Sequence, residues 1–126
     1  MNNFDVTQYQ DDEENIIDNQ TVSSIHTYNY TPRNEVELTK IIIKKFNDCL
    51  DKNKNKKTIT IDLSDINTEL ITNMAYLFRD VFISEHIYEK SSAHEIILDL
   101  TSWNTKNVID MNHMFDVCVS LISINL

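Results

Sequence analysis

The feature that most constrains the fold of this chain is a repeat in its second half. The stretch LDLTSWNTKNVIDMNHMFDVC, which begins at Leu98, follows the same pattern as IDLSDINTELITNMAYLFRDV, which begins at Ile61. Over the first 18 aligned positions, six pairs are identical, namely Asp62/Asp99, Leu63/Leu100, Asn67/Asn104, Thr68/Thr105, Met74/Met111 and Phe78/Phe115. A third copy begins at Ile124, 26 residues after Leu98, so the first copy carries an insertion of 11 residues within 79–95.

A fixed period of roughly 20 to 30 residues around an LxL core is typical of a solenoid. Each unit is too small to bury its own apolar face, so neighbouring units stack. Alternate residues of a strand point to opposite faces, so one face is expected to form the core. That face comprises Ile59, Ile61, Leu63, Ile96, Leu98, Leu100, Ile122, Ile124 and Leu126. A helix after each strand is expected to add Met74, Leu77 and Phe78, and then Met111, Met114 and Phe115.

The predicted fold class is therefore α/β: a short leucine-rich-repeat solenoid with a small parallel sheet on one side and helices on the other. A strand–helix cap is expected over residues 25–57. IHTYNYT, from Ile25, has strand composition, Thr31-Pro32 is expected to open a helix, and the helix then buries Val36, Leu38, Ile42, Phe46, Cys49 and Leu50. Residues 1–24 are acidic, have few apolar anchors and are predicted to be largely flexible. The repeats are assigned to 58–92 with the insertion, to 93–118, and to a partial unit at 119–126.

The stretch LDLTSWNTKNVIDMNHMFDVCVSL resembles the BspA-like leucine-rich repeat, also known as the mycoplasma 26-residue lipoprotein repeat. Its typical unit runs LDLSxWDTSxVTDMSxMFxGCxSL, and the resemblance extends over roughly residues 28–126. Two positions depart from that unit: Val117 stands where the family has glycine, and Ile66 stands where it has tryptophan. The resemblance implies a leucine-rich-repeat fold, and surface adhesion to host proteins where a signal or lipid anchor is present.

The residue inventory argues against an enzyme. The chain has no glycine, which excludes phosphate-binding loops of the GxGxxG and GxxxxGK types. The four histidines share no metal-ligand spacing, and the two cysteines form no CxxC pair. We therefore expect no catalytic residues, no metal and no cofactor. No apolar run is long enough to cross a membrane and no signal peptide is visible, so the expected location is cytoplasmic, with surface exposure only through an export route not visible here, and no membrane partner.

The formal net charge of −9 is unevenly distributed. Residues 1–30 carry −6, residues 31–57 carry +4, and residues 58–126 carry −7. An acidic chain is a poor ligand for a nucleic-acid backbone, so nucleic acid is not expected as its main partner. The lysine-rich DKNKNKK after the predicted helix is interpreted as a solvated helix exit, the alternative being a local contact with nucleic acid or anionic lipid.

The polar face of the predicted sheet is the candidate partner-binding site. It comprises Thr60, Asp62, Glu95, Ile97, Asp99, Ser123 and Asn125. Asp62 and Asp99 are expected to lie one strand spacing apart, about 4.8 Å. They form either a solvated pair or a docking surface for Lys or Arg of a partner. The last strand is expected to leave an unpaired edge at Ile124 and Leu126, which a second copy, a partner chain or the N-terminal segment would cover.

These features predict a non-enzymatic protein-interaction module. It would bind an intracellular protein with a basic surface through the sheet face, the inserted loop or the C-terminal edge. The first alternative is a small acidic inhibitor of the phage anti-defence type, which mimics nucleic acid and blocks a basic groove of a nucleic-acid enzyme. The second alternative is a surface adhesion module or a repeat that self-associates through its C-terminal edge.

Overall fold

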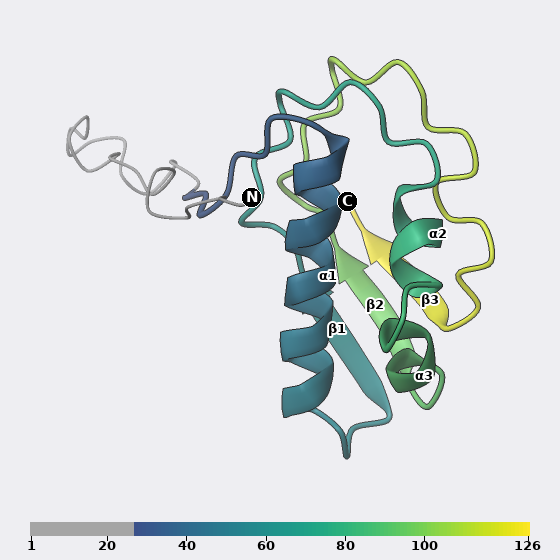
Figure 1. Ribbon diagram of the computed structural model, residues 1–126. Helices are drawn as coiled ribbons and strands as arrows, with labels where there is room; N and C mark the ends of the chain where they lie inside the picture. Colours follow the sequence, from purple (N-terminus) through teal and green to yellow (C-terminus); the bar gives the residue numbers. More distant parts are fainter. Residues whose placement is uncertain (1–26) are drawn as a thin grey trace.

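Three parallel strands and three helices make up the mixed α/β fold of residues 27–126, the part of the chain that the computed structural model describes (Figure 1). In chain order the elements are α1 (Glu35–Lys52), β1 (Thr58–Asp62), α2 (Leu77–Phe82), α3 (Ile87–Ser91), β2 (Glu95–Asp99) and β3 (Leu121–Asn125). The strands form one open sheet in the order β1-β2-β3, and both pairs are parallel. The helices lie over one face of this sheet.

The first helix begins later than the sequence predicts. The side chain of Asn34 accepts a hydrogen bond from the backbone N–H of Glu37 at 3.0 Å, which makes Asn34 the N-cap of α1. Pro32 therefore lies two residues before the cap and outside the helix. Glu35 and Glu37 occupy the first turn, whereas Val36 is exposed rather than part of the predicted buried stripe.

The core lies between the sheet and the helices, as the alternation of apolar residues predicts. In β1 and β2, Ile59, Ile61, Ile96 and Leu98 are buried, and their neighbours in sequence are exposed or half-buried. The helices contribute Leu38, Ile41, Ile42, Phe46 and Leu50 of α1, Leu77, Phe78, Val81 and Phe82 of α2, and Ile87 of α3. The connecting segments contribute Leu63, Ile66, Ile71, Met74, Leu100 and Met114. Burial of one such side chain contributes roughly 1.5 to 3 kcal/mol, so this shared core is the main source of stability.

The third strand departs from the predicted core register. Ile96 pairs with Leu121, whereas Ile97 pairs with Ser123, so an irregularity between them shifts the strand by one residue. Leu121 consequently packs against the core in place of Ile122, which is exposed. Leu126, also expected in the core, is 90% exposed because no described element lies over it.

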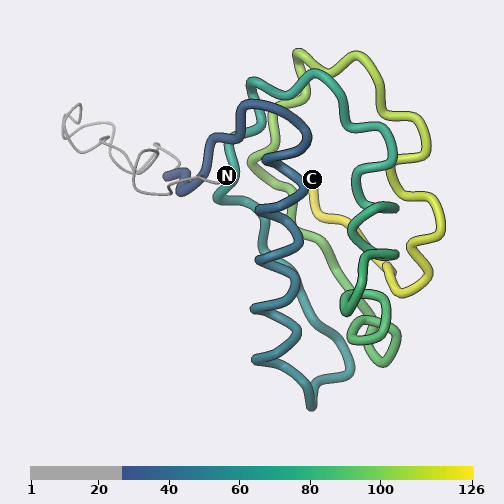
Figure 2. The backbone as a smooth tube through the Cα atoms, in the orientation of Figure 1, coloured from purple at the N-terminus to yellow at the C-terminus, as the bar shows by residue number. Residues whose placement is uncertain are grey.

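The two repeated segments run side by side beyond the strands (Figure 2). Backbone N–H groups of the first copy donate to carbonyls of the second: Met74 to Asp110 at 2.8 Å, Tyr76 to Asn112 at 3.0 Å and Phe78 to Met114 at 2.9 Å. Side chains at matching positions also stack. The rings of Phe78 and Phe115 lie 5.3 Å apart, and those of Tyr76 and His113 lie 5.0 Å apart. Each copy therefore rests on its equivalent in the other copy.

Asn and Asp side chains form the corners of both copies in this glycine-free chain. At three matched positions the side-chain oxygen accepts a hydrogen bond from the N–H two residues later, which is an Asx turn. The donor and acceptor pairs are Ser64 to Asp62, Glu69 to Asn67 and Ala75 to Asn73 in the first copy, and Thr101 to Asp99, Lys106 to Asn104 and Asn112 to Asp110 in the second, at 2.9 to 3.0 Å. These turns bend the chain without requiring glycine.

The helix predicted in the second copy is absent, which corrects the sequence-based expectation. Residues 111–118 form successive turns, and Met111 and Phe115 are exposed rather than buried, although Met114 joins the core. In the first copy α2 continues through Asp80, but the matching Val117 has a φ of 48°. This left-handed conformation ends helical geometry.

The strand predicted from Ile25 is also not formed by the described residues before α1. Tyr30 makes a single parallel bridge with Ile66, and its carbonyl accepts from the N–H of Asn67 at 2.8 Å. Pro32 follows two residues later and has no N–H to donate, so the pairing does not extend. Residues 25 and 26, and the segment predicted to be flexible, lie outside the described residues.

The left-handed conformation of Val117 yields a stability prediction. The left-handed conformation costs a residue with a Cβ about 1 to 2 kcal/mol, and glycine does not have this cost. Val117→Gly is therefore expected to raise the free energy of unfolding by about 1 kcal/mol. The control is Val119→Gly, since Val119 is also exposed but does not have a positive φ. Urea unfolding should show a higher free energy of unfolding for Val117→Gly and a lower one for Val119→Gly. A loss in both would contradict the assigned geometry.

Candidate functional site

The seven residues predicted to bind a partner lie on the outer face of the sheet, away from the helices. Thr60, Ile97 and Ser123 pair across the three strands, and Asp62, Asp99 and Asn125 form the next row. Glu95 lies opposite Thr58, whose hydroxyl donates to its carboxylate at 3.0 Å. All are exposed or half-buried. The sequence pattern predicted this arrangement correctly; whether the face binds a partner stays a prediction.

The paired aspartates have a local structural role. Oδ1 of Asp62 accepts from the backbone N–H and the hydroxyl of Ser64, at 2.9 and 2.6 Å. Oδ1 of Asp99 accepts from the N–H of Thr101 at 3.0 Å. Both carboxylates thus hold the turn that ends their strand, which explains why aspartate occurs at both positions.

The two edges of the sheet differ in whether another described element contacts them. Thr60 directs its carbonyl outward at the β1 edge, where Sγ of Cys49 on α1 lies 3.5 Å away and donates to it. At the other edge, the N–H of Leu100, the residue after β2, donates to the carbonyl of Asn125 at 2.9 Å. Peptide groups alternate in direction along a strand, so Ile124 points its own N–H and C=O away from β2. No described element covers the β3 edge.

Seven exposed apolar side chains fall within residues 109–126, and we call the surface formed by these residues the open end. Its members are Ile109, Met111, Phe115, Val117, Val119, Ile122 and Leu126, of which Ile109 is 88% and Val119 81% exposed. The sequence interpretation named only Ile124 and Leu126 as edge residues. The repeat itself contained a signal for more of them. Met74 and Phe78 of the first copy are buried where the second copy stacks on them, and Met111 and Phe115 occupy the matching positions of the second copy.

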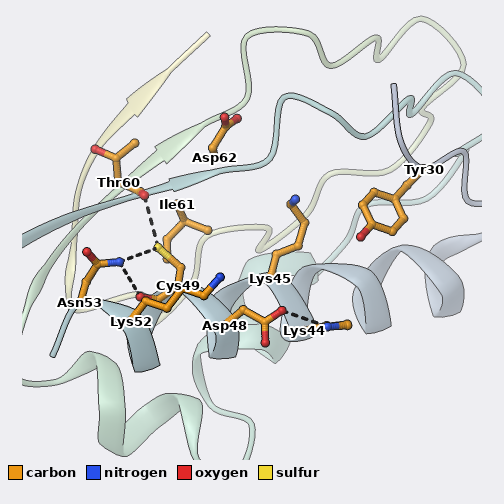
Figure 3. A pocket seen from close by; sticks show the side chains of 10 residues that line it. All are labelled: Tyr30, Lys44, Lys45, Asp48, Cys49, Lys52, Asn53, Thr60, Ile61 and Asp62. Carbon is orange, nitrogen blue, oxygen red and sulfur yellow. Dashed lines mark hydrogen bonds and ion pairs between the residues drawn. The ribbon is translucent and has the colours of Figure 1, made fainter. Parts of the chain in front are cut away.

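A groove of about 350 Å³ lies on the opposite side, between α1 and β1 (Figure 3). It is lined by Tyr30, Lys44, Lys45, Asp48, Cys49, Lys52, Asn53, Thr60, Ile61 and Asp62. Lys45 forms an ion pair with Asp65 at 3.0 Å and lies over the ring of Tyr30. Sequence reasoning did not find this groove, because it depends on how α1 packs against the edge strand.

No cluster of three or more His, Cys, Asp or Glu residues within residues 27–126 is placed to hold a metal ion. Both cysteines are free and half-buried. Burial raises the pKa of the Cys49 thiol, and burial together with the charge of Asp116 raises the pKa of Cys118 to about 11. Neither thiol is activated as a nucleophile. None of the helices in the described range is long and apolar enough to span a membrane.

Comparison with known proteins assigns the family. Residues 35–124 match a family described as "Mycoplasma protein of unknown function, DUF285". The chain belongs to the DUF285 family. The matched residues include α1, β1, β2, β3 except for its last residue, and both copies of the repeat. No curated protein and no solved structure gives a significant match to the chain.

The Asx turns predict how Asp99 contributes to stability. Asp99→Ala removes the acceptor for the N–H of Thr101 and is expected to lower the free energy of unfolding by about 1 kcal/mol. Asp99→Asn keeps the acceptor and removes the like charge next to Asp62, so its expected change is within about 0.5 kcal/mol. Urea unfolding of both variants separates the turn from the charge. An equal loss in both would show that the charge, rather than the turn, matters at this position.

Proposed function

We propose that this DUF285 chain is a non-enzymatic protein-interaction module that binds a protein partner at its open end. We infer that its two copies are units of a leucine-rich-repeat solenoid of the BspA-like kind, with α1 as the N-terminal cap. The observation that carries the proposal is the contrast between the two ends. The helix α1 lies against one end, whereas the other end has exposed apolar side chains and a strand edge that no element of residues 27–126 covers.

The contacts between the copies indicate what the open end can accept. The first copy offers the N–H groups of Met74, Tyr76 and Phe78 to carbonyls of the second. The matching groups of the second copy belong to Met111, His113 and Phe115, and they have no acceptor within residues 27–126. Three aligned donors beside an apolar surface suit a segment that supplies carbonyls and apolar side chains together.

The proposed partner therefore inserts an extended segment that pairs with β3 and continues along the second copy. Strand addition of this kind gives affinity through the backbone, and alternate side chains give selectivity. Side chains on one side of the added strand would cover Ile124 and Leu121, which already pack against the core. Side chains on the other side would lie beside Asn125, which forms one row across the sheet with Asp62 and Asp99. A basic residue fits best next to these two carboxylates.

The proposal predicts which variants lose the partner in affinity capture from a bacterial lysate. The open-end variant carries Ile122→Lys and Leu126→Lys, and the matched control carries Val36→Lys and Tyr88→Lys, two exposed apolar residues of α1 and α3. We expect the unmodified chain and the control to retain one partner at high salt, and the open-end variant to lose it. Amide hydrogen exchange with the purified partner should then show protection at Ile124.

Other outcomes contradict the proposal in distinguishable ways. A partner held equally by all three proteins would locate recognition elsewhere. A partner that is shed at high salt and displaced by nucleic acid would favour the acidic-inhibitor hypothesis. If no bait captures a protein and light scattering finds oligomers only where the open end is intact, the open end mediates self-association.

A further inference from the structure

The groove between α1 and β1 is lined by three lysines, two aspartates and several less polar side chains. Figure 3 shows α1 along one side and β1 along the other, with Tyr30 at one end and Asn53 at the opposite end. Cys49 lies between them, and its half-buried thiol contacts the carbonyl of Thr60 at 3.5 Å. The groove thus runs along α1, and its Tyr30 end is the end at which the chain enters the helix.

The charge of the groove is only partly compensated. Lys45 is committed to Asp65, and Lys44 pairs with Asp48 at 2.9 Å. Lys52 forms no ion pair with any residue in the described part of the chain. The surrounding residues 31–57 carry +4, although the whole chain carries −9. Three lysines and the two aspartates Asp48 and Asp62 line the groove, so its lining carries a net charge of +1 within an acidic protein.

The most acidic segment of the chain directly precedes the groove. Residues 1–26 contain six carboxylates and no lysine or arginine. Five of the six fall within DDEENIID, residues 11–18, where two isoleucines lie between the acids. This combination matches the groove in kind, since the acids suit the lysines, and the isoleucines suit the surface of Cys49 and Tyr30.

We propose that residues 11–18 of this chain bind along the groove between α1 and β1. The reach is sufficient: the nine residues from Asp18 to Thr27 span up to about 30 Å when extended. The groove follows α1 from Lys44 to Asn53, a rise of about 14 Å. Belonging to the same chain also lowers the affinity required, because a short connection between two binding segments gives an effective concentration of roughly millimolar. A contact with a millimolar dissociation constant is then about half occupied.

The test compares NMR amide shifts in full-length variants. The acid variant carries Asp11→Asn, Asp12→Asn, Glu13→Gln and Glu14→Gln. At low salt it should shift the amide signals of Cys49, Asn53 and Thr60 relative to the unmodified chain. In roughly 1 M salt, where the Debye length is about 3 Å, the difference should largely disappear.

Two lysine backgrounds supply the matched control. Lys44→Gln with Lys52→Gln removes two groove lysines, and Lys54→Gln with Lys56→Gln removes two lysines from the turn after α1. Both change the net charge equally, and neither touches the Lys45–Asp65 pair. The acid substitutions should shift the groove amides in the second background and leave them unchanged in the first.

Several results would overturn the proposal. These are the absence of shifts at the groove amides, equal shifts in both lysine backgrounds, or shifts that persist fully at high salt. A shift that fades on dilution would assign the contact to the acidic segment of a second molecule and would likewise contradict binding within one chain. None of these outcomes bears on the open end, so the proposed function is tested separately.

Discussion

Stacking between the two copies of the repeat is the interaction on which the rest of the structure depends. Neither copy encloses a core of its own. The first copy is completed on one side by α1 and on the other by the second copy, and the same matched positions make contact throughout. Trp103 illustrates this dependence, since its indole N–H donates to the carbonyl of Leu63 in the first copy at 3.0 Å and its ring stacks on Phe78. Within residues 27–126 the second copy has such a neighbour on one side only, and its exposed apolar side chains lie at the open end.

The absence of glycine makes the corners of the repeat depend on polar side chains. Six Asx turns at matched positions replace turns that glycine could form by backbone freedom alone. This accounts for the abundance of Asn and Asp along the two copies in structural terms. It also changes the interpretation of the acidic sheet face, because Asp62 and Asp99 are required locally whether or not a partner binds there. Charge on this face is therefore a weaker indicator of function than the exposed apolar surface.

Much of the fold was predictable, because the repeat determines which residues share a face. The parallel pairing of Asp62 with Asp99 and of Ile97 with Ser123 follows directly from aligning the copies. The failures have local causes that periodicity does not encode. Because of a one-residue irregularity in β3, Leu121 packs against the core where Ile122 was expected. The left-handed conformation of Val117 prevents a second helix. The sequence predicted the open end only in part and did not predict the groove between α1 and β1, since both depend on how whole elements pack against one another.

The most direct test of this account is whether α1 and the two copies unfold together. Trp103 is the only tryptophan of the chain and lies between the copies, so its fluorescence reports on their contact. The far-ultraviolet circular dichroism signal is dominated by α1, the 18-residue helix. If stacking holds the structure together, urea should produce one transition with the same midpoint by both probes. Separate midpoints, with α1 persisting after the tryptophan signal is lost, would show that this helix is stable without the repeats and would contradict the account.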